Sequence, residues 1–182
     1  MESKAFTEKP TEEVKQLTKA DNIDIIIAKP DHSDILAEFN YKMAYETEDI
    51  KIDAALVSKA IHRLVSDSSD EEGHKPYGFY LVAINAELAP IGCMLVTNEI
   101  NPTLGGLNYM IQSVFVEKEY RKCGVFRKLF NKTKEIAEND KDCKCLRLYV
   151  ETENTVAQAV YKKMGMDHVD FSFMEKDFIF NH

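Results

Sequence analysis

Cysteine is scarce in this chain, and tryptophan is absent. The 182 residues include four cysteines, Cys93, Cys123, Cys143 and Cys145, which are too few for a small disulfide scaffold. Cys143 and Cys145 form a C-x-C pair, but no second pair or histidine cluster lies nearby in the sequence to complete a tetrahedral metal site. We therefore expect free thiols, a reducing compartment and no bound metal.

Long apolar runs are also missing. Runs such as "IGCMLV" (91–96) and "YLVAI" (80–84) fall far short of the roughly 18 residues that span a bilayer. Residues 1–20 contain no apolar core of the kind that a secretory signal needs. These features predict a cytoplasmic protein without a membrane partner.

Positive charge is the third shortage, because 23 Lys and Arg stand against 31 Asp and Glu, a formal net charge of -8. Nucleic-acid-binding domains are typically basic, or carry a basic stripe, so we expect no nucleic-acid partner. The segment 117–134 departs from this balance, with seven Lys or Arg and two Glu. This local surplus predicts a site for one small anion.

The order of hydrophobic patterns predicts a polar lead-in over 1–21 and a single α/β domain over 22–182. Strand patterns occupy 23–30, 77–84, 90–97, 108–116 and 145–150, and the tail at 169–180 returns to strand character. Helical spacing runs from Ile35 to Met43, Leu56 to Val65, Val125 to Ala137 and Val156 to Met164. An exposed acidic loop is expected at 66–75.

The connections between these segments predict how they pair. The short link "NAELA" (85–89) favours an antiparallel hairpin of 77–84 with 90–97. A helix between 108–116 and 145–150 favours parallel neighbours, and α/β folds bind ligands at the carboxyl ends of such strands. Asn154 is a candidate N-cap of the last helix, and Gly165 its C-terminal stop.

The turn that follows residue 116 has the features of a phosphate site. A loop leading from a strand into a helix exposes N–H groups that carry partial positive charge, and Gly124 would let the backbone approach a ligand closely. Neither G-x-x-x-x-G-K-[ST] nor G-x-G-x-x-G occurs in the chain. The alternative is a charged helix start that is merely solvated.

Two separated motifs give the turn a context. "VFVEKEYRKCGVFRKLF" and the downstream "LRLYVETENTVAQAVYKKMGM" resemble the GCN5-related N-acetyltransferase superfamily, and "MIQSVFV" with "MAYETE" resembles a subgroup marked by a W-I-Q-S-V-Y-V strand. The resemblance covers about residues 23–175. It implies a mixed sheet of about six or seven strands, with splayed parallel strands forming an acyl-CoA cleft, and acetyl-CoA as the co-substrate.

The resemblance also implies where the cofactor binds. In the pattern Q/R-x-x-G-x-G/A, Phe126 replaces the final small residue, and its bulk would move the pyrophosphate toward Arg127. A second departure precedes the I-Q-S-V strand, where relatives often have a tryptophan and this chain has Asn108, Tyr109 and Met110. The acceptor pocket would therefore differ from that of relatives. The implied cofactor-binding residues are Val114, Phe115, Val116, Arg121, Lys122, Cys123, Gly124, Val125, Phe126, Arg127, Asn154, Ala157 and Tyr161.

The expected chemistry is attack of an amine on a thioester. Tyr161 stands where the superfamily places the proton donor for the leaving thiolate, although helical spacing alone favours a core tyrosine. Gln112 occupies the place where many relatives carry a glutamate base, and we assign it to the acceptor site. The remaining candidate bases are Glu46, Glu48 and Glu99, each of which could instead be a solvated carboxylate.

These observations predict an N-acetyltransferase acting on a primary amine of a small or amino-acid-like acceptor. Retention of Tyr161 favours the enzyme. The replacement of a carboxylate by Gln112 favours a catalytically silent acyl-CoA-binding regulatory module. A peptide or protein N-acetyltransferase is a third candidate. The sequence is also compatible with a homodimer.

Overall fold

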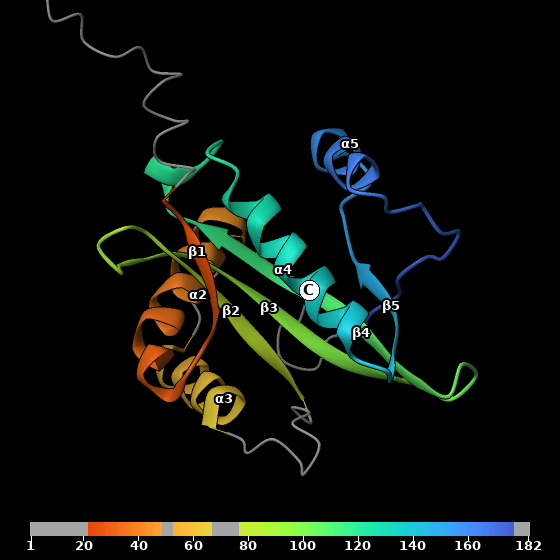
Figure 1. Cartoon of the computed structure of the whole chain (residues 1–182), viewed down its shortest axis with the longest axis horizontal. Helices are drawn as coiled ribbons and strands as arrows, with labels where there is room; N and C mark the ends of the chain where they lie inside the picture. The colour runs from red at the N-terminus through yellow and green to blue at the C-terminus, as the bar shows by residue number, and fades with distance from the viewer. Residues whose placement is uncertain (1–21, 49–52, 67–76, 177–182) are drawn as a thin grey trace, which may run out of the picture. The chain divides into compact units, whose positions relative to one another are not determined.

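The computed structural model describes residues 22–48, 53–66 and 77–176 (Figure 1). The lead-in at 1–21 and nearly all of the acidic loop predicted at 66–75 fall outside these residues. The chain forms two compact units, one up to Leu148 and one from Tyr149 onward, which are described separately.

The first unit contains a five-stranded sheet in the order β1-β2-β3-β4-β5. Its strands are β1 (Asp24–Ile27), β2 (Gly78–Ile84), β3 (Pro90–Asn101), β4 (Gly106–Val116) and β5 (Cys143–Leu148). β1 to β4 are antiparallel, and β5 runs parallel to β4. The predicted hairpin and the predicted parallel pair are both confirmed. The residues described form five strands, where six or seven were expected.

The prediction of a strand at 169–180 is wrong for the part that can be checked. Residues 169–176 have no regular secondary structure, and 177–180 fall outside the described residues. Phe171 and Met174 are 88% and 91% exposed. Alternating side chains favour an extended backbone, but a strand also needs a hydrogen-bonded neighbour, which the pattern alone cannot supply.

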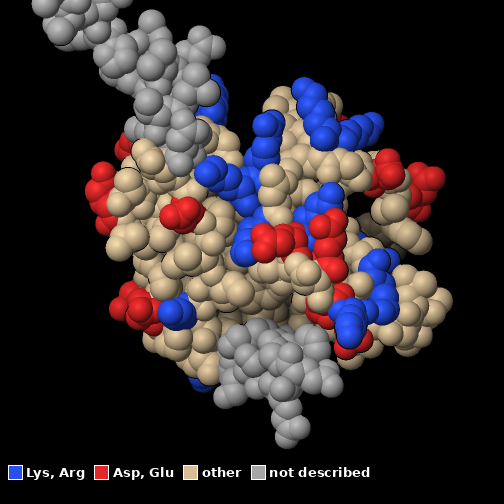
Figure 2. Space-filling model, in the orientation of Figure 1, with Lys and Arg blue, Asp and Glu red and all other residues tan. Residues whose placement is uncertain are grey.

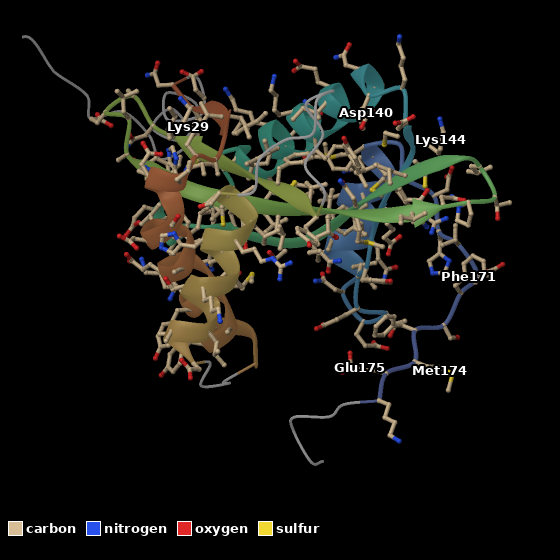
Figure 3. All side chains as sticks on the ribbon, turned by 90° about the horizontal axis from the view of Figure 1, so that it is seen from below. Lys29, Asp140, Lys144, Phe171, Met174 and Glu175 are labelled. Atoms are coloured by element: carbon tan, nitrogen blue, oxygen red, sulfur yellow. The ribbon has the colours of Figure 1, made fainter. Side chains whose placement is uncertain are left out.

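Helices cover both faces of the sheet (Figure 3). α2 (Ser33–Glu48) and α3 (Ala54–Ser66) lie on one face, and α4 (Val125–Asn139) lies on the other. Short 3₁₀ turns, η1 (Pro30–His32) and η2 (Lys118–Tyr120), precede α2 and α4, and the second unit holds α5 (Thr155–Lys163). Every residue of β2 is buried, because helices cover both of its sides, and this accounts for its unbroken apolar run.

The hydrophobic core holds the end of β4 that precedes the turn between β4 and α4. On the α2 side, the rings of Phe39 and Phe115 stack with their centroids 4.9 Å apart, and both side chains are buried. On the α4 side, the Thr133 hydroxyl donates to the Leu129 carbonyl and lies 3.2 Å from the Met94 sulfur. Aromatic packing from α2 therefore holds β4, the strand that carries the predicted site, and α4 contacts its neighbour β3 on the other face.

Candidate functional site

The turn between β4 and α4 has the backbone geometry of an anion site. Gly124 is the N-cap of α4 and adopts a left-handed conformation with φ of 78°, and Lys122 is also left-handed at 63°. A Cβ built on Gly124 would meet no atom within 4 Å, so the space in front of this residue is open. Left-handed turns and helix starts both direct N–H groups at anions. The turn thus fits a phosphate.

Two cations of the turn remain available to a ligand. Lys122 and Arg127 are exposed, and neither side chain makes a hydrogen bond or ion pair with any residue that the structure describes. Lys128 is committed elsewhere, because its ammonium donates to the Ile23 carbonyl at 2.8 Å. Figure 2 shows Lys and Arg side chains gathered over the start of α4, in the upper centre of the view. Lys122 and Arg127 are therefore the cations of this turn that have no partner among the described residues.

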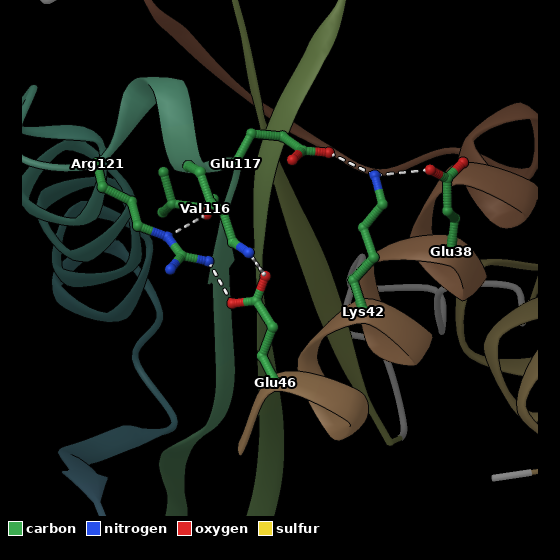
Figure 4. A network of polar contacts seen from close by, with 7 residues as sticks. Glu38, Lys42, Glu46, Val116, Glu117 and Arg121 are labelled. Carbon is green, nitrogen blue, oxygen red and sulfur yellow. Dashed lines mark hydrogen bonds and ion pairs between the residues drawn. The ribbon is translucent and has the colours of Figure 1, made fainter. Parts of the chain in front are cut away.

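Arg121 has a different role from its neighbours (Figure 4). Its Nε donates to the Val116 carbonyl at 2.9 Å, and its guanidinium donates to a Glu46 carboxylate oxygen at 2.6 Å. Lys118 lies 3.4 Å from the other oxygen of Glu46. The Arg121 side chain thus links the end of α2 to the end of β4 and to the turn.

This contact also decides the protonation of Glu46. The hydrogen bond from Arg121, together with Lys118, lowers the pKa of the Glu46 carboxyl below its usual value. A carboxylate stabilised in its ionised form is a weaker proton acceptor. Of the three candidate bases, Glu46 is the one that the structure pairs with the cations of the turn.

A second ion-pair group lies beside the first (Figure 4). The Lys42 ammonium lies 2.7 Å from carboxylate oxygens of both Glu38 and Glu117. Hydrogen bonds to Glu117 and Glu38 raise the pKa of Lys42 to about 12. Lys42 therefore stays charged near neutral pH and fastens α2 to the residue that follows β4.

β4 carries a bulge at Gln112. Leu95 pairs with Ser113 and Val96 pairs with Ile111, which leaves Gln112 as the extra residue between them. The pairing of β4 with β5 ends at Ile111 and Leu148, whereas β4 remains in register with β3 as far as Val116. Gln112 is exposed, and its amide donates to the Thr97 hydroxyl at 2.9 Å.

The predicted cofactor residues of β4 and α4 divide by burial. Phe115, Cys123 and Val125 are core residues, whereas Val114, Val116 and Phe126 are half-buried. Phe126 lies near Phe130, with ring centroids 6.0 Å apart. The three core side chains pack in the interior and so help to fix the backbone of this region.

The structure places the other candidate bases apart from Glu46. Glu99 lies in β3, on the face that also carries Thr97 and Gln112, and its carboxylate is 3.7 Å from Arg147 of β5. Glu48 is the last residue of α2, and its side chain falls outside the described residues. The structure thus brings together Glu99 and Gln112 on one sheet face, and Glu46 and Arg121 at the turn.

The second unit confirms the predicted limits of its helix. The Asn154 side chain accepts a hydrogen bond from the Ala157 amide at 3.0 Å, which is the predicted N-cap. Gly165 is left-handed with φ of 86°, and the Met166 amide bonds to the Tyr161 carbonyl, as expected after the last helical turn. Tyr161 is half-buried, and this burial raises the pKa of its hydroxyl.

Two further features, a metal-binding cluster and a membrane-spanning helix, can be assessed over the described part of the chain. Residues 22–48, 53–66 and 77–176 contain no group of three or more His, Cys, Asp or Glu placed to hold a metal ion. Cys145 contacts the Asn108 side chain, and Cys143 contacts the Cys145 carbonyl. Within the same residues, no helix has the length and apolar character needed to cross a bilayer.

Comparison with protein-family models gives a match to the acetyltransferase (GNAT) family over residues 38–166. The chain belongs to the GNAT family. The matched region includes β4, the turn, α4 and α5. GNAT enzymes are N-acetyltransferases that use acetyl-CoA, and this GNAT protein is accordingly an N-acetyltransferase.

Solved structures give the same fold. A possible acetyltransferase from Clostridium difficile 630 is 34% identical, with a TM-score of 0.76 over 87% of this chain and 99% of that one. A ribosomal-protein-alanine N-acetyltransferase from Brucella melitensis biovar Abortus 2308 is 15% identical, with a TM-score of 0.63 over 86% and 99% of the two chains.

An aminoglycoside N-acetyltransferase, AAC(6')-Iy in complex with CoA, is 16% identical, with a TM-score of 0.66 over 86% and 95% of the two chains. At 15% and 16% sequence identity, these last two structures show similarity of fold alone. A comparison with curated protein sequences gives no match.

The sequence patterns of this GNAT protein did not predict the long-range ion pairs found among the described residues, of which Arg121–Glu46 and Arg147–Glu99 bear most on the site. Arg121 and Glu46 are 75 residues apart in the chain, and the sequence predicts a phosphate ligand for the first and a base for the second. Arg147 carries no sequence signal of a site, because it is one charged position in an alternating strand. The placement of Arg147 opposite Glu99 arises from strand pairing, which no local pattern specifies.

Proposed function

We propose that this GNAT protein transfers the acetyl group of acetyl-CoA to a primary amine of a small molecule or amino-acid-like acceptor. The observation that carries the proposal is the open, left-handed Gly124 turn at the start of α4, beside Lys122 and Arg127, which have no partner among the residues that the structure describes. Backbone N–H groups and these side chains would hold the pyrophosphate.

The bulge at Gln112 supports an acyl-CoA cleft beside β4. Because β5 pairs with β4 only up to Ile111, the last residues of β4 keep one edge unpaired with β5. By the resemblance, backbone N–H groups between Ser113 and Phe115 would polarise the thioester carbonyl. When bound, acetyl-CoA supplies an activated acetyl group.

The chain must also handle protons. A primary amine with a pKa near 10.4 is free base for only about one molecule in a thousand at neutral pH, so a proton acceptor near the amine is useful. We propose Glu99 for this role, because it shares a sheet face with Gln112 and its contact with Arg147, at 3.7 Å, is longer than the 2.6 Å hydrogen bond that Glu46 accepts from Arg121. Glu48 is the alternative base.

We propose Tyr161 as the proton donor to the departing thiolate. A tyrosine hydroxyl has an ordinary pKa near 10 and is protonated at neutral pH, as an acid must be, and burial raises the pKa of Tyr161 further. The amine nitrogen forms the amide bond as the carbon–sulfur bond breaks, the thiolate takes one proton to become a thiol, and the other proton of the original ammonium is released.

The rival proposal is a regulatory module that binds acyl-CoA without turnover. It is favoured by Gln112, which cannot accept a proton at useful pH. Acetylation of a peptide or protein amine is a second alternative within the enzyme class. The deciding experiment measures thiol release from acetyl-CoA with amino acids, polyamines, aminoglycosides and peptides, and CoA affinity by calorimetry on the same sample. Turnover with any amine removes the rival, and CoA binding without turnover supports it.

A further inference from the structure

Three neighbouring strands present polar side chains on the sheet face that bears Gln112. Thr97 pairs with Met110 and Glu99 pairs with Asn108, while Met110 also pairs with Arg147. Paired residues lie on the same face of a sheet, and so do residues two apart along a strand. Thr97, Glu99, Gln112 and Arg147 therefore form one surface, which we call the β3–β5 polar patch.

The ion pair of this patch spans a whole strand. Glu99 is in β3 and Arg147 is in β5, so their backbones are about 10 Å apart, with β4 between them. Both side chains lean inward until a guanidinium nitrogen lies 3.7 Å from a carboxylate oxygen. Asn108 and Met110 of β4 are only 3% and 2% exposed. The pair thus lies over β4 and forms part of the patch surface.

Arg147 retains its capacity to bind a ligand. A separation of 3.7 Å is too long for a hydrogen bond. No other polar partner of this side chain occurs among the described residues, so its five N–H donors have no acceptor there. The side chains of Arg147 and Glu99 are 50% and 36% exposed. A planar guanidinium with unused donors can take a carboxylate through two parallel hydrogen bonds.

The charges of the patch discriminate between classes of amine. One carboxylate and one guanidinium give a net charge of zero, and the two lie side by side. A polycationic acceptor such as a polyamine or aminoglycoside would be repelled by Arg147. An α-amino acid carries an ammonium and a carboxylate on one carbon. Its ammonium can face the Glu99 carboxylate while its carboxylate faces the Arg147 guanidinium.

The position of the patch also suits the reaction. Glu99 is two residues from Thr97, or about 7 Å along β3, and Thr97 contacts Gln112 at the bulge. Along the sheet, Arg147 is level with Met110 and Glu99 is level with Asn108, so the patch starts at the bulge of β4, beside which the thioester carbonyl is proposed to bind.

We propose that the acceptor is a free α-amino acid whose carboxylate is bound by Arg147 and whose ammonium is bound by Glu99. This inference rests on the proposed acetyl transfer to an amine. Arg147 is then a specificity-determining residue, and the acceptor must carry a carboxylate next to its reactive amine.

The test compares matched acceptors that differ in one charge. Initial rates are measured with each common amino acid, with its α-carboxamide and with the corresponding decarboxylated amine. The best amino acid should exceed its amide and its decarboxylated amine in kcat/KM by roughly tenfold to a hundredfold, the worth of a charge-assisted contact. Arg147→Gln should remove this preference while CoA affinity is retained, and Arg147→Lys should restore part of it.

Lys144→Gln is the matched control. Lys144 is an exposed cation of the same strand, bonded only to the Lys141 carbonyl among the described residues, and its replacement should leave the preference intact. Equal rates for acid and amide, or an unchanged preference in Arg147→Gln, would overturn this inference while the proposed function stands. Absence of turnover with every amine would overturn the proposed function and this inference together.

Discussion

Substitution of Gly124 tests the phosphate site most directly. Gly124 is left-handed, so any side chain there costs about 1–2 kcal/mol of backbone strain, whatever its chemistry. Because a Cβ would meet nothing within 4 Å, neither alanine nor glutamate should add a clash with the protein. Gly124→Ala and Gly124→Glu should therefore lose similar stability and differ mainly in charge and reach.

The charge difference can be estimated from Coulomb's law. A glutamate carboxylate about 6 Å from a phosphate charge is repelled by about 0.7 kcal/mol at the dielectric constant of water and about 3 kcal/mol at an effective value of 20. Gly124→Glu should therefore bind CoA roughly 3-fold to 100-fold more weakly than Gly124→Ala. At 1 M salt, where the Debye length is about 3 Å, this gap should narrow.

Calorimetric titration of CoA into both folded variants gives the answer, with circular dichroism and thermal unfolding as the check on folding. Equal CoA affinities for the alanine and glutamate variants at low salt would refute the placement of the pyrophosphate at this turn. A gap that does not change with salt would indicate steric blocking in place of charge repulsion.

Three further predictions concern Tyr161, Asn154 and Glu46. Tyr161→Phe keeps the ring and removes the hydroxyl, so kcat should fall by about a hundredfold at unchanged CoA affinity, and a wild-type rate would exclude Tyr161 as the acid. Asn154→Ala should lower the free energy of unfolding by about 1 kcal/mol through loss of the cap, whereas Asn154→Asp keeps the cap. A CoA affinity that is reduced in both variants would support a ligand role for the Asn154 amide. An unchanged CoA affinity in both would leave Asn154 only its capping role. Because the folded-state pKa of Glu46 is lowered, its ion pairs stabilise the protein above the ordinary carboxyl pKa and are lost as pH falls through the lowered value. The melting temperature of wild type should therefore exceed that of Glu46→Gln at pH 7, and the difference should shrink below about pH 4; a difference constant from pH 7 to pH 3 would show that these ion pairs contribute nothing.

The fold was largely predictable because its signals are local. The apolar run of β2 and the short link at 85–89 predicted the hairpin, and the single helix between 108–116 and 145–150 predicted the parallel pair. Within the described residues, one strand prediction fails, at 169–176. This segment has the side-chain alternation of a strand, but alternation does not specify which neighbouring strand it would pair with.

The candidate site was predictable to a lesser degree. The two motifs in the sequence predicted the family and the phosphate turn, since Gly124 and the cations around it are neighbours in the chain. The motif pattern also suggested Arg121 as a phosphate ligand, but the structure gives its guanidinium to Glu46 and the Val116 carbonyl. Whether Arg121 also reaches the pyrophosphate stays a prediction.

The sequence alone determined the features set by contacts between near neighbours: the helix start at Gly124, the cap at Asn154, the strand and helix periods, and the charge surplus of the turn. Tertiary structure decided which charges meet. The pairing of Glu46 with Arg121 depends on how α2 packs on the sheet, and the meeting of Glu99 with Arg147 depends on the order and register of β3, β4 and β5. Strand order and helix packing are set by burial summed over the whole core, so no short stretch of sequence specifies them.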